Sequence, residues 1–256
     1  MPAQRASAAL PAQPPVAVEP SARSARIARI ATLDWPALRT AVADCRACSL
    51  CETRRQTVFG SGSTQAHWLV VGEAPGADED ASGEPFVGAA GQLLDAMLRA
   101  LGLSRADDAS MTGSDAASGE TDSERVPPQR RAYIANTLKC RPPGNRNPAP
   151  EEMAQCEPFL QRQIELLRPR LILAMGRFAA QSLLRSTEPL GRLRGRVHRY
   201  QGLPLVVTYH PAYLLRSPAE KAKAWEDLCL AAETMDAMDA MQVTPAAKVP
   251  DAPTTA

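Results

Sequence analysis

Two groups of cysteines have a spacing that suits metal binding. Cys45 and Cys48 form a C-x2-C pair, and fifteen residues separate Cys140 from Cys156. Four thiolates from two such pairs hold either zinc or an iron–sulfur cluster, and their spacing does not separate the two cofactors. Buried free cysteines are the plainer interpretation, which we adopt for Cys229 because it falls on an amphipathic helical pattern.

Polar and aromatic residues that suit a planar ligand follow several short apolar runs. The stretch GEAPG over residues 72–76 follows the first run, and Glu79 and Phe86 come soon after it. Asn136 ends the second run, and His210, one of three histidines, follows the fourth. Glycines let a backbone approach a ligand, an aromatic ring stacks on a planar group, and Asn and His form directed hydrogen bonds. Each residue alone has a plainer structural role, so it is the set that indicates a site.

The elements that must position these residues alternate between strand and helix. The apolar runs predict β-strands over residues 68–71, 133–136, 171–174 and 205–208. Helical patterns cover residues 91–101, 150–167, 176–184 and about 218–235. This alternation predicts the α/β class, with a parallel sheet covered by helices on both faces. Ligands of such folds bind beyond the carboxyl ends of the strands, so we expect Glu73, Asn136 and His210 to meet at one edge.

Composition narrows the class of protein. The chain has 256 residues, 45% of them apolar, and its 29 Lys and Arg nearly cancel its 28 Asp and Glu. The longest apolar runs, Leu171–Met175 and Leu228–Ala232, are far shorter than the roughly 20 residues of a membrane helix. The first 31 residues lack the apolar segment of a secretory signal. Clustered cysteines favour a reducing compartment, so we expect a cytoplasmic protein of the bacterial type that binds no membrane.

Three segments are predicted to lie outside the folded core. Residues 1–34 are rich in Ala and Pro and residues 238–256 in Ala, Pro and Thr, so both are expected to be disordered tails. The Arg-bearing amino end also resembles an organelle transit peptide, although a flexible tail is the plainer interpretation. Residues 104–130 carry six acidic residues and are expected to form a flexible insert. Residues 35–237 are predicted to form one domain.

The motifs together resemble those of a known family. The series GEAPG…ED…G-x-PFVG-x-AGQLL, N-x-x-KCRPP-x-NR-x-P and YHPAYLLR is similar to family 4 uracil-DNA glycosylases, the iron–sulfur type. The resemblance implies a three-layer α/β/α sandwich with a four-stranded parallel sheet. It also implies a [4Fe–4S] cluster held by Cys45, Cys48, Cys140 and Cys156. Cys51 falls where relatives vary and is left out of this set, and the acidic insert departs from the compact family pattern.

The implied activity is that of a DNA repair enzyme which flips uracil out of DNA and hydrolyses its N-glycosidic bond, leaving an abasic site. The resemblance assigns uracil binding to Gly72, Glu79, Phe86 and Asn136. An Asn amide matches the O4 acceptor and N3 donor of uracil. Cytosine inverts both groups and would leave the buried amide unpaired, at a cost of about 1–3 kcal/mol per group. Phe86 would stack on the base, and Glu79 is expected near its C5 side, where thymine carries a methyl group.

The resemblance assigns catalysis to His210 and Glu73. Bond cleavage develops negative charge on the uracil, which a hydrogen bond from His210 to O2 would stabilise. Better-known relatives carry a water-activating Asp in a GQDP motif, but this chain has Ala74 at that position and Glu73 one residue earlier. Whether Glu73 orients water, stabilises the sugar cation or only positions the backbone stays open.

DNA binding requires phosphate contacts even when the total charge of a protein is near neutral. Residues 160–216 hold ten arginines and two acidic residues, which is typical of a DNA-binding face or of a solvated basic surface. We expect a monomer whose partner is uracil-containing DNA, with the acidic insert pointing away from it. The predicted DNA contacts are Arg141, Arg146, Arg194, Leu214 and Arg216.

Two alternative functions stay open. One is a uracil-DNA-binding relative that crosslinks to DNA instead of turning over; that subgroup carries GEQPG and a basic insert, whereas this chain has GEAPG and an acidic one. The other is a nucleic-acid-binding module built on a four-cysteine zinc site. It explains the cysteines and arginines but gives no role to Glu73, Phe86, Asn136 and His210.

Overall fold

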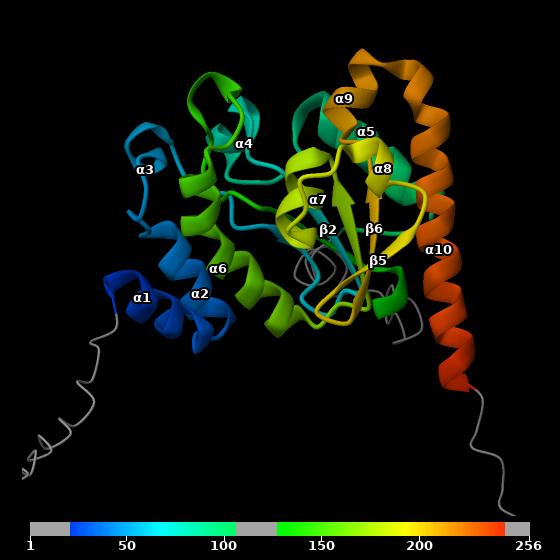
Figure 1. Cartoon of the computed structure of the whole chain (residues 1–256), viewed down its shortest axis with the longest axis horizontal. Helices are drawn as coiled ribbons and strands as arrows, with labels where there is room; N and C mark the ends of the chain where they lie inside the picture. The colour runs from blue at the N-terminus through cyan, green and yellow to red at the C-terminus, as the bar shows by residue number, and fades with distance from the viewer. Residues whose placement is uncertain (1–20, 106–126, 244–256) are drawn as a thin grey trace, which may run out of the picture.

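The computed structural model of the chain describes residues 21–105 and 127–243 (Figure 1). A six-stranded sheet in the order β1-β3-β2-β4-β6-β5 lies between two layers of helices. Its strands are β1 (Ser61–Gly62), β2 (Trp68–Gly72), β3 (Ala132–Asn136), β4 (Leu171–Met175), β5 (Val197–Tyr200) and β6 (Leu203–Thr208). The α/β class and the three layers are as predicted.

The four predicted strands form the parallel centre of the sheet, and two unpredicted strands extend its edges. β3, β2, β4 and β6 pair in parallel, whereas β1 and β5 pair antiparallel with β3 and β6. The sheet is therefore mixed and six-stranded, which corrects the prediction of four parallel strands. β1 has only two residues, and β5 (VHRY) is partly exposed, so neither shows the continuous apolar run of a buried strand.

Successive residues of the central strands face opposite helical layers, which explains why these strands are apolar throughout. Val70 of β2 packs in the cluster formed with helices α5 and α10, whereas Leu69 and Val71 pack in the cluster formed with α6 and α7. The bounds of these helices are α5 Gly88–Ala100, α6 Pro150–Leu167, α7 Arg177–Leu184 and α10 Lys221–Val243. Short helices complete the connections, namely α4 (Ala77–Ser82), α8 (Leu190–Leu193) and α9 (Pro211–Arg216).

Three amino-terminal helices pack beside α6 and around the cysteines. They are α1 (Ala22–Ala31), α2 (Trp35–Ala43) and α3 (Leu50–Thr53). Residues 22–34 are therefore not part of a disordered tail, because Ile30 is buried with Leu38 and Phe159 in this third apolar cluster. Similarly, α10 continues past the predicted boundary at residue 238. The rest of the predicted tails and insert, residues 1–20, 106–126 and 244–256, lies outside the described residues.

Within residues 21–105 and 127–243, no helix has the combination of length and apolar character that a membrane span requires.

Candidate active site and cysteine cavity

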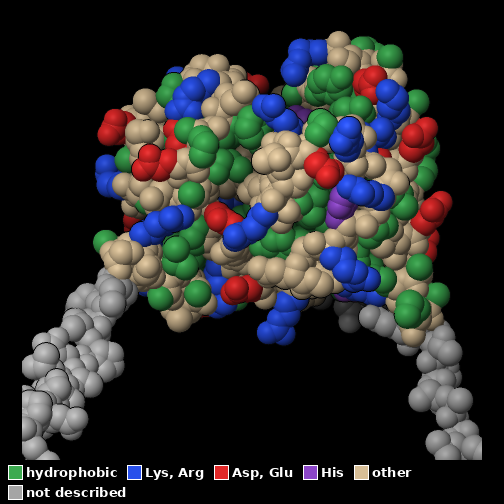
Figure 2. All heavy atoms as spheres, viewed as in Figure 1, with side chains coloured by type: hydrophobic (Ala, Val, Ile, Leu, Met, Phe, Trp, Pro, Cys, Tyr) green, Lys and Arg blue, Asp and Glu red, His purple; other side chains and the backbone are tan. Residues whose placement is uncertain are grey.

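A cavity opens at the carboxyl ends of the parallel strands, where the sequence places its polar motifs. Figure 2 shows a notch at the top of the molecule, with Lys and Arg side chains on both sides of it. The register brings the strand ends together, because Gly72 pairs with Asn136 and Met175 with Thr208. The predicted site residues that line this cavity are Glu73, Glu79, Phe86, Asn136, Arg146, His210 and Arg216.

Asn136 presents an unused hydrogen-bonding atom to the cavity. Its side chain is 2% exposed, and its Oδ1 is buried without a hydrogen-bond partner among the described residues. Gly72 lies directly opposite, and a Cβ at that position would collide with Asn136 Oδ1 and with the Phe86 ring. Glycine is therefore required at position 72 to leave room for both side chains. A buried unpaired carbonyl oxygen is costly, so this atom is suited to receive a donor from a ligand.

The turns that follow β2 and β3 are joined by backbone contacts. Thr137 donates from its amide to Gly72 O at 3.0 Å and from its hydroxyl to Glu73 O at 2.6 Å. The Leu138 amide donates to the same Glu73 carbonyl at 3.0 Å. These bonds fix the backbone of Glu73 relative to that of Asn136, beyond the end of the sheet.

Phe86 is held in an uncommon conformation beside His210. Its φ is +53°, in the left-handed region that few non-glycine residues adopt, and its ring stacks on that of His210 with centroids 5.2 Å apart. Arg105 Nη1 donates to the carbonyls of Phe86 and Pro85 at 3.1 and 3.2 Å, while Arg105 forms an ion pair with Asp95. A conformation this strained persists only where surrounding contacts hold it, and such sites are often functional.

Glu79 supports the same loop through its carboxylate. Oε1 accepts from the Val87 amide at 3.0 Å and Oε2 from the Gly76 amide at 2.9 Å, so Glu79 ties the loop of Phe86 to the GEAPG turn. The sequence predicted Glu79 near the C5 side of the base. It does line the cavity, with both carboxylate oxygens bonded to backbone. Nothing local in the sequence points to Arg105, which precedes the acidic insert.

His210 caps helix α9 in a way that fixes its tautomer. Its Nδ1 accepts a hydrogen bond from the Ala212 amide at 3.2 Å, so the proton of the neutral ring is on Nε2. Burial lowers the pKa of His210 to about 4, and the Arg216 guanidinium contributes to this lowering. The ring is therefore neutral at physiological pH, and it lines the cavity.

Glu73 is half-buried in the cavity wall. Burial raises the pKa of its carboxyl group above the ordinary value, and the Arg177 guanidinium opposes this rise. No hydrogen bond reaches the Glu73 carboxylate from the residues that the structure describes, so it is accessible to a ligand or to water. Arg177 also lines the cavity, with its guanidinium over the Phe178 ring, and sequence reasoning did not single it out.

Two of the five predicted DNA contacts, Arg216 and Arg146, are exposed and line the cavity. Arg216 has no acidic partner in the described parts of the chain. Both terminal nitrogens of Arg146, in contrast, donate to the buried Glu152 carboxylate, at 2.9 and 2.5 Å. A third predicted contact, Arg141, donates from Nε to Asn145 Oδ1 at 2.7 Å and lies outside the residues that line the cavity.

The other two predicted contacts are turned inward. Arg194 forms an ion pair with the fully buried Asp227 at 2.8 Å and lies over the Tyr209 ring. Leu214 is 1% exposed and belongs to the core, whereas Leu215 is 42% exposed. Helix α9 packs against α5 and turns Leu214 into the core, so the predicted contact Leu214 is not on the surface.

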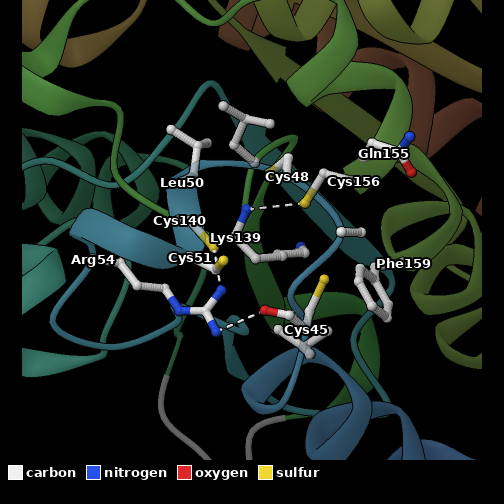
Figure 3. Close-up of a pocket in the computed structure, with 13 residues that line it drawn as sticks. Cys45, Cys48, Leu50, Cys51, Arg54, Lys139, Cys140, Gln155, Cys156 and Phe159 are labelled. Atoms are coloured by element: carbon white, nitrogen blue, oxygen red, sulfur yellow. Dashed lines mark hydrogen bonds between the residues drawn. The ribbon is translucent and has the colours of Figure 1, made fainter.

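The predicted metal ligands converge on a second cavity. Figure 3 shows Cys45, Cys48, Cys140 and Cys156 turned toward one another around it, although they come from distant segments of the chain. Cys51 lines the same space. Cys229 is on α10, apart from the others, and is only partly buried, which corrects the prediction of a buried core cysteine.

Three of these sulfur atoms accept hydrogen bonds from nitrogen. The donors are Arg54 Nη1 to Cys140 at 3.0 Å, the Lys139 amide to Cys156 at 3.3 Å and Arg26 Nη2 to Cys45 at 3.6 Å. Burial raises the pKa of the Cys156 thiol to about 12 and also raises that of Cys140. The hydrogen bonds from Arg54 and Lys139 oppose this rise, because they stabilise the thiolate. The thiolate is the form in which cysteine binds metal.

The amino acids around the second cavity offer sulfur ligands from several cysteines. Among the described residues, no three Cys, His, Asp or Glu side chains are close enough to hold one metal ion. Zinc gathers its four ligands around one centre, whereas a four-iron cluster distributes its cysteines over separate iron atoms. A set of four cysteines suits either group.

Comparisons with known proteins agree with this geometry. The family model described as the uracil DNA glycosylase superfamily matches residues 59–229. A type-4 uracil-DNA glycosylase of Archaeoglobus fulgidus is 40% identical over 69% of this chain and 81% of that protein. Its counterpart in Pyrobaculum aerophilum is 38% identical over 77% of this chain and 93% of that protein. Another, in Thermotoga maritima, is 36% identical over 71% and 83% of the two chains.

Proposed function

Since this chain belongs to the uracil DNA glycosylase superfamily, and within it to the type-4 uracil-DNA glycosylases, we propose that it excises uracil from DNA. It flips the uracil nucleotide out of the helix and hydrolyses the N-glycosidic bond, leaving an abasic site. The observation that carries this function is the buried, unpartnered Asn136 Oδ1 in a cavity that also contains the neutral donor His210.

Asn136 reads the base. The N3–H of uracil donates to Asn136 Oδ1, which satisfies an atom that the described residues leave unpaired. Cytosine carries an acceptor at N3, so it would place two acceptors against each other in a buried site at a cost of about 1–3 kcal/mol. Phe86 stacks on the base, and Gly72 gives the base room to reach Asn136.

His210 stabilises the leaving group. As the bond breaks, negative charge develops on uracil O2, and the His210 Nε2–H donates to it without any proton transfer. Because the ring is already neutral and its tautomer is fixed by the Ala212 amide, it needs no reorganisation during the reaction. Such preorganisation is the usual source of a large rate effect from one donor.

Glu73 orients the attacking water. Its carboxylate is half-buried and has no hydrogen-bond partner in the described ranges, and its raised pKa makes it a stronger base than an exposed glutamate. The backbone contacts from Thr137 and Leu138 fix its position beside the base. The negative charge of the Glu73 carboxylate also stabilises the positive charge that develops on the sugar.

The DNA backbone crosses the notch beside Arg177 and Arg216. Both side chains line the cavity, and neither forms an ion pair with the described acidic residues. Leu215 and Tyr213 are exposed on the same short helix. We propose that the enzyme acts as a monomer in the reducing cytoplasm, a compartment that suits its six free cysteines.

We also propose that Cys45, Cys48, Cys140 and Cys156 hold a [4Fe–4S] cluster. The convergence of these four cysteines on one cavity and the N–H···S bonds to three of them support this assignment. A cluster at this position contributes folding energy by holding the amino-terminal segment to the loop between β3 and α6. No step of the reaction requires it, because the residues that contact the base belong to the other cavity.

Replacing Cys48 with serine is expected to remove iron and visible absorption and to lower the melting temperature, because metal-binding energy is also folding energy. The matched variant Cys51→Ser should keep all three properties. Iron content, the absorption spectrum and thermal unfolding measure them on the same samples. Bleaching by Cys51→Ser with a coloured Cys48→Ser would contradict the ligand set, and a colourless wild type containing zinc would contradict the cluster.

The function is tested by incubating the purified protein with a labelled oligonucleotide that contains one uracil. We expect free uracil and an alkali-sensitive abasic site, with many turnovers per protein molecule. A protein that becomes covalently attached to the DNA and releases no further uracil would support the crosslinking alternative. Binding to DNA with no loss of uracil would support the zinc-module alternative.

A further inference from the structure

Lys139 lies between the two cavities and forms hydrogen bonds with a residue of each, Asn136 in one and Cys156 in the other. It is 1% exposed, and its Nζ donates to the main-chain carbonyl of Asn136 at 2.9 Å and to Gln163 Oε1 at 2.6 Å. Its own amide donates to Cys156 Sγ at 3.3 Å, and its carbonyl accepts from the Val58 amide at 2.8 Å. Figure 3 shows the hydrogen bond from the Lys139 amide to Cys156.

Packing alone does not explain a lysine at this position. Burial of an ammonium group is costly unless it is well hydrogen-bonded, and an apolar side chain would fill the same volume without that cost. The hydrogen-bond acceptors of Lys139 Nζ are a carbonyl and an amide oxygen, and no carboxylate of the described residues pairs with it. Gln163 is itself anchored, because its Nε2 donates to Phe59 O at 3.0 Å.

The position of Asn136 depends on this arrangement. Asn136 is the last residue of β3, so its carbonyl lies where the chain leaves the sheet. Its side-chain Oδ1 has no partner in the described residues that would orient it. The direction of the Asn136 side-chain amide therefore depends on the position of its backbone. A recognition group must be held within about 0.5 Å of its productive position to be effective. Lys139 Nζ holds that backbone from below the cavity.

We propose that Lys139 is a positioning residue for base recognition, which fixes the carbonyl of Asn136 against Gln163 and α6 and so aims the Asn136 amide at uracil. This inference rests on the proposed function, because it assigns a support to the residue that reads the base. It also connects the cysteine cavity to the base-binding cavity, since Lys139 adjoins Cys140 and bonds to Cys156.

Lys139→Met tests this role, because methionine fills the volume without donating hydrogen bonds. The readout is selectivity: the affinity for DNA with a non-cleavable 2′-fluoro-deoxyuridine divided by that for the same DNA with cytosine at that position. We expect this ratio to fall by about tenfold, the effect of one misaligned buried hydrogen bond. Gln163→Met, which removes only one anchor of Nζ, should lower the ratio by less. Iron content and melting temperature report whether each variant is folded.

Arg170→Met is the matched control. It removes a partly buried ion pair with Asp239 at the opposite end of β4, so it destabilises the protein without touching Asn136. Unchanged selectivity in a folded Lys139→Met, or an equal loss in Arg170→Met, would overturn the proposal. If Lys139→Met does not fold, Gln163→Met decides, because a lower ratio supports the role and an unchanged ratio refutes it. A wild type that fails to release uracil would instead refute the proposed function.

Discussion

Replacing His210 with alanine is expected to slow cleavage of the N-glycosidic bond by about 100- to 1,000-fold, the usual effect of losing one donor to a developing oxyanion. DNA affinity should change little, because the hydrogen bond to uracil O2 strengthens only in the transition state. Single-turnover kinetics on a uracil-containing oligonucleotide measure the rate of cleavage. The affinity is measured separately with a non-cleavable analogue.

A purely structural role for His210 gives a different result. The ring caps α9 through the Ala212 amide, so its loss also costs stability. His210→Asn offers a side-chain oxygen to the same amide and serves as the control for the cap. If a destabilised His210→Ala cleaves uracil at nearly the wild-type rate, the catalytic role is wrong. Slow cleavage in both variants, with normal melting in His210→Asn, supports it.

The pH dependence follows from the burial of His210. Its folded-state pKa of about 4 lies below the ordinary value of 6.5, so the cleavage rate should show no histidine inflection near pH 6.5. The unfolded chain takes up a proton near 6.5 that the folded chain binds only near 4. The folded state therefore loses stability as the pH falls through this interval. His210→Asn should lack this contribution.

Replacing Asn136 with aspartate is expected to reduce uracil excision by at least about 100-fold, because an ionised carboxylate accepts hydrogen bonds but cannot donate to uracil O4. The same change should shift relative preference toward cytosine, whose amino group donates. Competition between oligonucleotides that contain uracil or cytosine measures this preference. Asn136→Ala is the control, since it should lose uracil activity with no gain toward cytosine.

The Asn136 prediction is falsified if Asn136→Asp excises uracil at an unchanged rate. Melting temperature and iron content distinguish a recognition defect from a folding defect, because Asn136 lies close to the loop that carries Cys140. Together, the His210 and Asn136 variants separate the rate of bond cleavage from the identity of the base. The zinc-module alternative predicts neither effect, since it assigns no chemistry to the cavity that these residues share.

The sequence by itself determined the centre of the fold and the edge at which the site lies. The continuous apolar runs of β2, β3, β4 and β6 required burial on both faces, which only a parallel sheet between two helical layers supplies. Residues that follow such strands meet at their carboxyl ends, so the strand pattern alone places Glu73, Asn136 and His210 together. The motif spacing likewise placed four cysteines in two pairs.

Tertiary structure decided what depends on contacts between distant segments. Helix α1 carries three arginines among small and apolar residues, and it is ordered because Ile30 is buried beside α6. Of two adjacent leucines, Leu214 is buried and Leu215 exposed because of the way α9 packs against α5. Burial also made His210 a neutral donor. Local pattern specifies the type of an element, whereas burial, pKa and hydrogen-bond partners depend on which elements lie against it.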